Sequence, residues 1–384
     1  MNTPHHAENV ISVQEYQARL EMIRQAMAHR GLDALLVYSW KRGQVRYLSG
    51  YKPNYVANVA MVVVLPDRDP TLLIRFPFDL GRARKVSWLQ DVRASGDLEG
   101  LVSDCQAILD SAIVRGSFIG LVGGDSVVDE LPHSMYEMLS RALPDYRLVP
   151  ASYILEKARM CKSVAEAELV RESARVADAT LATARSVAQA GRSEYELIAA
   201  AEATARALGA EEILSVIASA AWELIRPPEG RLLGENEMLV AEFAVQVGGY
   251  FTQVPGVFHT GTPSAEQREM YSVAYAGYLA GVQAACPGHT VGDVARAELA
   301  ILEDSGWLEW HAYDLGHGDG LDHPEIPAIT PESNVPIEPG MVLCIHPGLR
   351  KPGVGGVFVG GTVLIGEDGA IPLHQVAPEM WDWK

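Results

Sequence analysis

The sequence lacks the features of membrane proteins and of nucleic-acid-binding proteins. Its 384 residues contain no run of about 18 apolar residues, so we expect no membrane-spanning helix. The opening segment, MNTPHHAENV, includes neither the basic nor the apolar part of a signal peptide. The formal net charge of −18 opposes binding to nucleic acid and to anionic membranes, because both are negatively charged. We therefore expect no membrane partner and no nucleic-acid partner.

Cysteine is scarce, and its spacing excludes two kinds of small scaffold. The four cysteines are far apart in the sequence, and none forms a CxxC pair: Cys105, Cys161, Cys286 and Cys344. A disulfide framework or a zinc ribbon requires closer, paired spacing. Reduced thiols in an intracellular compartment fit this pattern, so we predict a cytoplasmic protein.

What the chain does contain is an ordinary globular composition, with 48% hydrophobic and 21% charged residues. Its length corresponds to two or three domains. Val13–His29 has apolar residues at helical spacing, and Gly31 follows as a stop. Short β-rich runs alternate with further helical stretches in the first half. The runs are Leu35–Tyr38, Ala60–Leu65, Leu72–Ile74 and Phe118–Val122, and the helical stretches are Asp97–Ser111 and Met135–Ala142. This alternation predicts an open sheet flanked by helices.

The second half begins with a long helical pattern. Ser163 precedes it and Glu166 stands three positions later, which predicts a capping box at the start of the helix. Further helical segments and a late β-rich run are predicted at Glu194–Leu208, Ser264–Ala285, Val291–Ser305 and Gly361–Ile365. We expect the domain boundary between residues 155 and 156.

Five segments of the second half resemble the pita-bread fold family, which includes methionine aminopeptidase, prolidase, aminopeptidase P and creatinase. In family order they are RMCKSVAEAELVRESARVADA, LVAEFAVQVGGYFTQVPGVFHTG, LGHGDGLDHPEIP, IEPGMVLCIHPGL and GGTVLIGEDGA. The first half resembles the creatinase-type N-terminal domain, including YLSGY at Tyr47–Tyr51. The resemblance implies an α+β protein. Residues 1–155 would form a smaller α/β creatinase-type domain, and residues 156–384 the pita-bread catalytic domain.

The family positions that hold two metal ions are altered in this chain. Where relatives have two Asp, one His and two Glu, this chain has Glu242, Gln253, His317, His346 and Gly360. Gln253 is a neutral and poor ligand, and Gly360 has no side chain. A two-metal site requires carboxylates that bridge the ions and balance their charge. The pattern therefore predicts that the dinuclear metallopeptidase site is lost.

From this loss we expect an enzyme that has left peptide hydrolysis, closest in kind to creatinase and ectoine hydrolase. The expected substrate is a small polar nitrogen-containing metabolite, and the expected reaction is hydrolysis of a C–N bond. In a site without metal, Glu242 would be nucleophile or general base, and His317 and His346 would carry protons. The alternative is one Zn²⁺ or Fe²⁺ ion held by the same three residues, with lyase or oxidative chemistry. The expected cofactor is thus none or a single divalent metal ion.

Further candidates lie close to this set in the sequence. His323 follows His317 by six residues, one fewer than the family spacing. The resemblance implies that it contacts the substrate or the transition state, and in the version with a metal ion it would be the acid–base partner. Asp319 and Asp322 lie between the two histidines and are candidates to orient an imidazole ring. Gln253 is a candidate substrate contact.

Substrate anchors are predicted in both halves of the chain. Arg226 lies near the position of a substrate-facing histidine in creatinase-like relatives, and its planar guanidinium suits a carboxylate. The segment YLSGYKPNYVAN matches the creatinase stretch whose arginine binds the substrate carboxylate. It has Asn58 there, with Tyr55 nearby, which disfavours creatine itself. In relatives this segment reaches the active site of the partner subunit, so the resemblance implies a homodimer.

A binding module without activity is the alternative from a different class, because a histone-chaperone subunit carries a pita-bread domain of that kind. The acidic charge is compatible with such a role. Glu242, His317 and His346 argue against it. A scaffold has no need to keep a carboxylate and two imidazoles at facing site positions.

Overall fold

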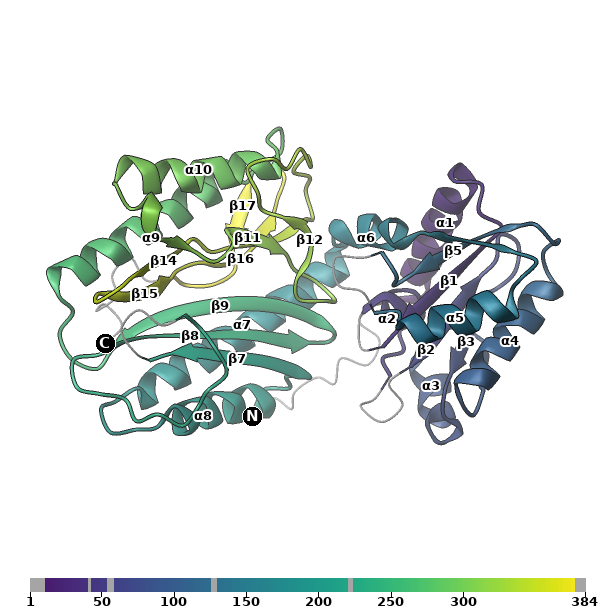
Figure 1. Ribbon diagram of the computed structural model, residues 1–384, viewed down its shortest axis with the longest axis horizontal. Coiled ribbons are helices and arrows are strands. Elements are labelled where there is room, and N and C mark those ends of the chain that lie inside the picture. Colours follow the sequence, from purple (N-terminus) through teal and green to yellow (C-terminus); the bar gives the residue numbers. More distant parts are fainter. Residues whose placement is uncertain (1–10, 41–42, 54–58, 126–129, 220–223, 377–384) are drawn as a thin grey trace. The chain divides into compact units, whose positions relative to one another are not determined.

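The computed structural model comprises two compact units, whose elements are labelled in Figure 1. The residues that it describes are 11–40, 43–53, 59–125, 130–219 and 224–376. The N-terminal unit ends at Arg159 and the C-terminal unit begins at Met160, so the predicted boundary falls inside helix α6 (Ser152–Met160). None of the helices within the described ranges is long and apolar enough to cross a membrane.

The described residues of the N-terminal unit form a six-stranded sheet with flanking helices, as the alternating patterns predicted. The strand order is β4-β3-β2-β1-β5-β6, with β1, β5 and β6 parallel to one another and β2 antiparallel to its neighbours. The strands are β1 (Ala34–Ser39), β2 (Ala60–Val64), β3 (Thr71–Ile74), β4 (Asp91–Ala94), β5 (Phe118–Val122) and β6 (Arg147–Pro150). The helices are α1 (Val13–His29), α2 (Gly43–Ser49), η1 (Pro77–Asp79), α3 (Leu80–Val86), α4 (Leu98–Asp110), α5 (His133–Ala142) and α6.

Local signals set the ends of α1. The Ser12 side chain accepts a hydrogen bond from the Glu15 backbone N–H, which satisfies one of the unpaired donors at the helix start. Beyond the helix, Gly31 has a φ of 63°, a conformation that glycine adopts without the steric cost of a side chain. The predicted helix and its glycine stop are confirmed.

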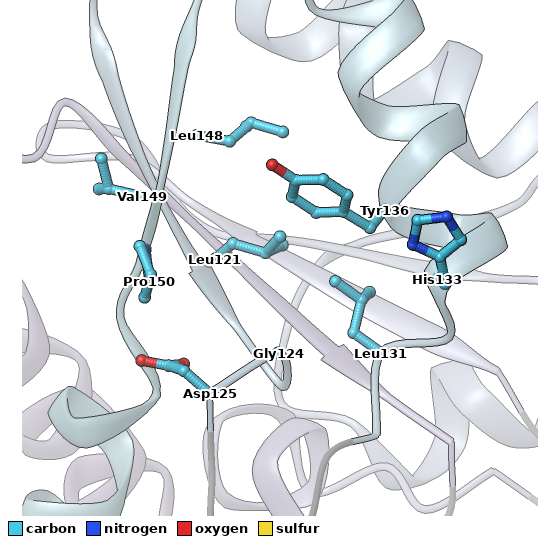
Figure 2. A pocket seen from close by; sticks show the side chains of 9 residues that line it. All are labelled: Leu121, Gly124, Asp125, Leu131, His133, Tyr136, Leu148, Val149 and Pro150. Carbon is cyan, nitrogen blue, oxygen red and sulfur yellow. The ribbon is translucent and has the colours of Figure 1, made fainter.

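A pocket of about 380 Å³ lies in this unit beyond the carboxyl ends of β5 and β6 (Figure 2). Asp125 and Pro150 line one side, and His133 and Tyr136 of α5 line the other. Ligands often bind at the carboxyl ends of parallel strands. Here Asp125 Oδ1 already accepts a hydrogen bond from the Ser152 backbone N–H at 3.1 Å. The described clusters of potential metal ligands all lie in the C-terminal unit, so we place the candidate site there.

Four long helices and three sheets make up most of the described part of the C-terminal unit. The helices are α7 (Val164–Val187), α8 (Glu194–Ala207), α9 (Ala265–Ala284) and α10 (Val291–Asp304). The predicted capping box is present at α7, where Ser163 accepts from the Glu166 backbone N–H and the Glu166 carboxylate accepts from that of Ser163. The predicted helices and the β-rich run Gly361–Ile365 are confirmed.

Two of the three sheets have three strands and the other has five. One has the order β7-β8-β9, the second β12-β11-β13-β16-β17 and the third β10-β14-β15. Their strands are β7 (Glu212–Ala218), β8 (Met238–Val247), β9 (Tyr250–His259), β10 (His311–Ala312), β11 (Gly316–Gly318), β12 (Glu325–Ala328), β13 (Val342–Ile345), β14 (Gly348–Lys351), β15 (Gly355–Phe358), β16 (Gly361–Ile365) and β17 (Ala370–Pro372). A short 3-10 turn, η2 (Leu308–Trp310), precedes β10.

The β8–β9 hairpin presents two different faces. On β8, Ala241 and Phe243 belong to the apolar core formed with α7 and α8. Because side chains alternate along a strand, Glu242 points to the opposite face. Gln253 of β9 pairs in register with Ala244, so it shares that face with Glu242. Figure 1 shows α7 and α8 on one side of this sheet and β14, β15 and β16 on the other. The alternation therefore turns two polar side chains toward the sheets that carry the histidines.

Candidate active site

A buried carboxylate and a buried amide face each other on the β8–β9 hairpin. Glu242 is 4% exposed and Gln253 is 3% exposed. Gln253 Nε2 donates a hydrogen bond to Glu242 Oε1, while Glu242 Oε2 and Gln253 Oε1 have no hydrogen-bond partner among the described residues. Burial raises the pKa of Glu242 to about 7, against the lowering effects of His323 and of the Gln253 hydrogen bond. The site thus holds a carboxyl group that can gain and lose a proton near neutral pH.

The three predicted histidines lie together, with His317 in the middle. His317 is on β11, His346 directly follows β13, and His323 is in the loop after β11. The ring centroid of His317 lies 5.0 Å from that of His323 and 5.2 Å from that of His346. The structure therefore brings together the histidines of two separate sequence motifs.

Hydrogen bonding and burial indicate the protonation of these rings. His317 Nδ1 lies 2.9 Å from the Gly318 carbonyl oxygen, which can only accept, so Nδ1 carries a proton and Nε2 is the nitrogen that this contact leaves free. Burial and, as a smaller effect, the neighbouring His317 lower the pKa of His346 to about 4. His346 is neutral at pH 7, which is the form that accepts a proton or binds a metal ion.

Asp319 orients His323, as the sequence analysis suggested. Its Oδ1 lies 2.8 Å from His323 Nδ1, and its Oδ2 accepts a hydrogen bond from Thr362 Oγ1 at 3.1 Å. Asp319 is fully buried, so these contacts hold the imidazole in one orientation. The other candidate, Asp322, uses its backbone N–H to bond Glu325 Oε1 at 3.1 Å.

The backbone at Gly360 leaves no room for a side chain. Its φ is 152°, and a Cβ atom added there would lie 1.9 Å from the Ile345 carbonyl oxygen and 2.7 Å from His346 Cα. Real Cβ atoms do not approach backbone atoms so closely. A carboxylate at this position would require the chain to move away from β13, which is the physical reason for glycine.

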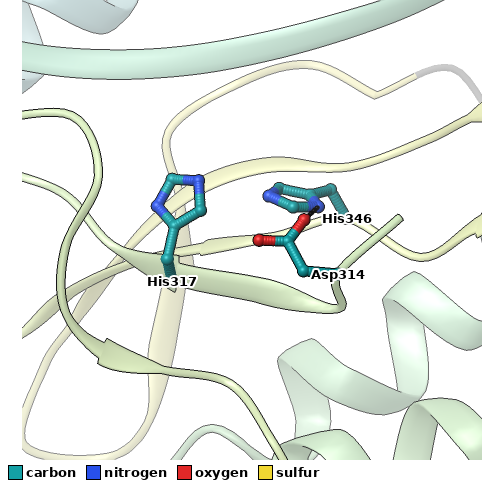
Figure 3. Close-up of side chains that lie close together, drawn as sticks. All are labelled: Asp314, His317 and His346. Atoms are coloured by element: carbon teal, nitrogen blue, oxygen red, sulfur yellow. Dashed lines mark ion pairs between the residues drawn. The ribbon is translucent and has the colours of Figure 1, made fainter. Parts of the chain in front are cut away.

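Asp314 is a site residue that the sequence analysis missed. Its Oδ1 lies 3.9 Å from His346 Nδ1, and one ligand atom from each of Asp314, His317 and His346 lies within 4.8 Å of the others (Figure 3). A second such group contains His317, Asp319 and His323, so the two groups share His317. The signal that could have revealed Asp314 is an acid three positions before His317, directly ahead of the quoted motif.

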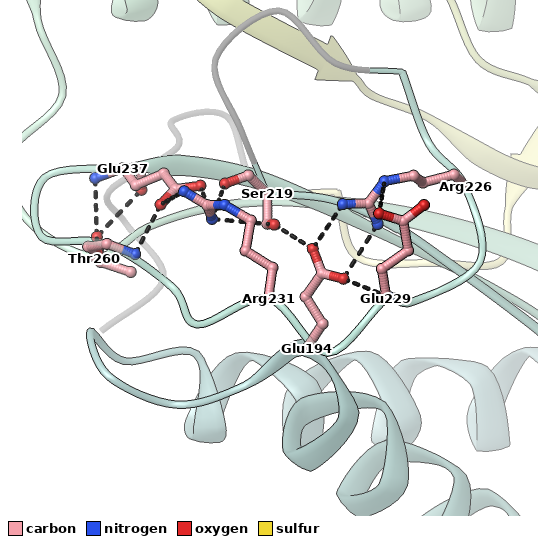
Figure 4. A network of polar contacts seen from close by, with 8 residues as sticks. Glu194, Ser219, Arg226, Glu229, Arg231, Glu237 and Thr260 are labelled. Atoms are coloured by element: carbon pink, nitrogen blue, oxygen red, sulfur yellow. Dashed lines mark hydrogen bonds and ion pairs between the residues drawn. The ribbon is translucent and has the colours of Figure 1, made fainter.

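Arg226 is engaged in an ion pair. Its Nη2 and Nη1 lie 3.0 Å and 3.1 Å from the two carboxylate oxygens of Glu194, which is fully buried at the start of α8 (Figure 4). Ser219 Oγ donates to the same carboxylate. This arrangement gives Arg226 a structural partner, and we do not retain it as a substrate anchor. The predicted anchors Tyr55 and Asn58 lie outside the described residues.

The donor atoms of the site fit a divalent metal ion. Both ring nitrogens of His346 are buried and have no hydrogen-bond partner among the described residues, and the same is true of Glu242 Oε2 and Gln253 Oε1. Buried polar atoms in proteins are nearly always satisfied. The unpartnered nitrogens of His346, which lie in a group of potential ligand atoms, therefore indicate a missing ligand. Imidazole and carboxylate donors together suit transition-metal ions such as Zn²⁺, Co²⁺ and Mn²⁺.

Two family profiles match the chain. The profile of metallopeptidase family M24 matches residues 168–367, which is more than half of the chain. The profile of the creatinase/prolidase N-terminal domain matches residues 19–161. The two matches correspond to the two units of the structure and confirm the predicted two-domain fold.

Individual relatives agree with these profiles. The uncharacterized peptidase YqhT of Bacillus subtilis is 24% identical over 355 residues, which cover 91% of this chain and 96% of the relative. The Xaa-Pro dipeptidase of Pyrococcus furiosus is 28% identical over 233 residues, covering 59% of this chain and 66% of the relative. The solved prolidase of Pyrococcus horikoshii OT3 superposes with a TM-score of 0.83 at 22% identity, covering 94% of this chain and 99% of that chain. This last likeness establishes the fold.

These relatives overturn two expectations. An enzyme for a nitrogen-containing metabolite, close to creatinase and ectoine hydrolase, is contradicted because the relatives are peptidases and Xaa-Pro dipeptidases. A site with no metal or with a single ion is contradicted as well, because prolidases of this family typically use two metal ions. The error arose because the activity and the metal content were judged from the five family positions alone, whereas the fold also brings Asp314 close to His317 and His346. The chain belongs to metallopeptidase family M24.

Proposed function

We propose that this protein is a peptidase that hydrolyses short peptides, with dipeptides of the Xaa-Pro type as its substrate class. The proposal is supported by M24 relatives along most of the chain, among them the Xaa-Pro dipeptidase of P. furiosus. The observation that carries it is the buried Glu242 carboxylate beside the histidine cluster, inside the region that the M24 profile matches. Peptide hydrolysis requires a proton acceptor and a proton donor in such a site.

Hydrolysis adds one water molecule across the peptide bond. The water oxygen bonds to the carbonyl carbon, the C–N bond breaks, and the leaving nitrogen gains a proton. In this proposal Glu242 accepts the proton of the attacking water, because its Oε2 is buried and has no hydrogen-bond partner among the described residues. His323, whose Nδ1 is held by Asp319, delivers a proton to the leaving nitrogen. The products are a free amino acid and proline.

Divalent metal ions would bind here through His317 and His346, because the neutral ring of His346 keeps a nitrogen lone pair available and His317 Nδ1 already bonds the Gly318 carbonyl oxygen. When bound, such an ion acts as a Lewis acid that polarises the scissile carbonyl group. Exclusion of water by the surrounding residues strengthens every electrostatic interaction inside the site. His346 is 1% exposed and packs against Phe358, with ring centroids 4.7 Å apart, which keeps this side of the cluster dry.

The homodimer implied by the creatinase-like first half stays a proposal. It rests on the resemblance of the segment that begins with Tyr47–Tyr51 to one that reaches across the dimer in relatives. Size-exclusion chromatography coupled to light scattering measures the mass of the protein in solution directly. A mass of one chain at micromolar concentration would contradict the dimer.

The test of the activity is a panel of dipeptides given to the full-length protein with added Mn²⁺, Co²⁺ or Zn²⁺. We expect cleavage of Xaa-Pro dipeptides and slower cleavage of matched dipeptides that lack proline. Glu242→Gln should lower the turnover number by a factor of about 10² to 10⁴, because the proton acceptor is removed. The control Glu303→Gln changes an exposed acid on α10 and should leave turnover unchanged. The absence of dipeptide cleavage with every ion would refute the proposed activity.

A further inference from the structure

We propose that Asp314 is a metal ligand and that it binds a divalent transition-metal ion together with His317 and His346. Asp314 does not occupy any of the five family ligand positions, which in this chain are Glu242, Gln253, His317, His346 and Gly360. The proposal concerns the binding of the ion itself, so it is tested without any substrate.

The first support is the environment of His346. The side chain is 1% exposed, yet neither ring nitrogen has a hydrogen-bond partner among the described residues. A buried polar group without a hydrogen-bond partner destabilises the folded protein. A neutral imidazole needs both a donor and an acceptor as neighbours, and a metal ion on one nitrogen supplies the missing partner there. His346 therefore marks a position where a ligand is expected.

The second support is the direction of the donors. His317 Nδ1 is already within 2.9 Å of the Gly318 carbonyl oxygen, which fixes the tautomer and leaves Nε2 for an ion. Figure 3 shows the Asp314 carboxylate directed toward the His346 ring, with His317 opposite. The three residues come from β11, from the turn before it and from the segment after β13. Two segments that are distant in the sequence thus converge on one point.

The spacing is close to that of a metal site. Metal–ligand bonds of about 2.0–2.2 Å place two ligand atoms of one ion about 3–3.5 Å apart. Here His346 Nδ1 and Asp314 Oδ1 are 3.9 Å apart, and the three ligand atoms lie within 4.8 Å of one another. His346 is held by burial, whereas the Asp314 side chain is 64% exposed. A rotation of Asp314 closes the remaining distance at little cost.

The second group of potential ligands, His317, Asp319 and His323, is less suited to bind an ion. Asp319 already accepts hydrogen bonds from His323 and from Thr362, at 2.8 Å and 3.1 Å. Binding an ion through these oxygens would break contacts that orient His323. The unpartnered nitrogens of His346 make the group with Asp314 the more favourable one.

The donor set also restores negative charge. Two imidazoles and a carboxylate suit Zn²⁺, Co²⁺ or Fe²⁺. Gln253 and His346 carry no carboxylate, and the backbone at Gly360 excludes a side chain, so three of the four carboxylates of the family pattern are missing. Asp314 supplies a carboxylate from a different position in the chain.

The experiment is a Co²⁺ titration of the full-length protein after chelator treatment, followed by visible absorption and by calorimetry. Co²⁺ bound to imidazole and carboxylate donors gives absorption bands that the free aqueous ion lacks at the same intensity. We expect such bands in the unsubstituted protein and at least about a tenfold weaker Co²⁺ affinity in Asp314→Asn. Asp304→Asn makes the same chemical change at an exposed position of α10 and should bind Co²⁺ as tightly as the unsubstituted protein.

Two controls keep the result interpretable. Thermal unfolding without metal should be the same for Asp314→Asn and the unsubstituted protein, because the Asp314 side chain is largely exposed. His346→Ala should also abolish the Co²⁺ bands. Unchanged bands and affinity in Asp314→Asn would overturn the proposal, and so would the absence of Co²⁺ bands in the unsubstituted protein. Failure of dipeptide cleavage with intact Co²⁺ binding would refute only the proposed activity.

Discussion

Gln253 Nε2 donates a hydrogen bond to Glu242 Oε1 from the neighbouring strand of the β8–β9 hairpin. The amide stabilises the ionised form of the carboxylate and so opposes the rise in pKa that burial causes. Where relatives have a second acidic residue, this chain therefore has the amide of Gln253, which attracts the carboxylate of Glu242. Glutamine in place of this acid reduces the negative charge of the site, and its amide stabilises the Glu242 carboxylate without a metal ion.

Replacement of Gln253 by Asp should make the stability of the protein depend on divalent metal. Two buried carboxylates would repel each other, so without metal we expect the free energy of unfolding to fall by about 1–3 kcal/mol. Co²⁺ or Mn²⁺ should recover part of this loss, because an ion that binds only the folded state stabilises it. Gln253→Asn has the same length as Asp without its charge and is the control. Equal metal-dependent shifts in melting temperature for the two variants would contradict the prediction.

Gly360→Ala should destabilise the protein strongly. The added Cβ atom would lie 1.9 Å from the Ile345 carbonyl oxygen, and backbone cannot yield as a flexible side chain can. Gly353 also has a positive φ, of 79°, but a Cβ atom there would meet nothing within 4 Å. Gly353→Ala should therefore cost about 1–2 kcal/mol from backbone strain alone. Denaturant unfolding should show a loss for Gly360→Ala that is larger by at least about 2 kcal/mol.

Arg226→Ala should lower stability rather than substrate affinity. The variant leaves the fully buried Glu194 carboxylate without its guanidinium partner, which costs about 3–5 kcal/mol. The pair between Arg192 and Glu196 is exposed on both sides, so Arg192→Ala should have little effect on unfolding. The KM for the best dipeptide should be unchanged in both variants at a temperature where they are folded. A raised KM without a loss of stability would instead support Arg226 as a substrate anchor.

Glu298 should make the protein less stable as the pH rises. It is fully buried on α10, its two carboxylate oxygens have no hydrogen-bond partner among the described residues, and burial raises its pKa well above the usual 4.5. Above pH 4.5 the unfolded chain releases a proton that the folded chain keeps. The free energy of unfolding therefore falls by up to about 1.4 kcal/mol per pH unit until the folded pKa is reached.

Glu298→Gln should remove this decline, because the amide does not ionise. Urea unfolding at several pH values between 5 and 8 measures the slope for each protein. Glu303→Gln, on the exposed side of the same helix, should keep the slope of the unsubstituted protein. A Glu298→Gln variant with an unchanged slope would show that another group causes the pH dependence.

Much of the fold could be predicted because its signals are local. The apolar spacing of Val13–His29 and the capping box at Ser163 depend on residues within one or two helical turns, and both were predicted correctly. The candidate site was predicted in part. Glu242, His317 and His346 were identified from motifs, and the fold brings the histidines together. The predictions of the metal content and of the substrate class were wrong. They counted the lost ligands at five positions and took no account of other residues that the fold brings close to the site.

The sequence by itself determined the two-domain fold, its helices and the residue types at the five family positions, since periodicity, capping and motif order are properties of the chain. Tertiary structure alone decided which charges meet. It brings Asp314 beside His346, pairs Arg226 with Glu194 and closes the space at Gly360. These contacts join residues that are distant in sequence. Burial makes them decisive, because it removes the water that would otherwise satisfy each group.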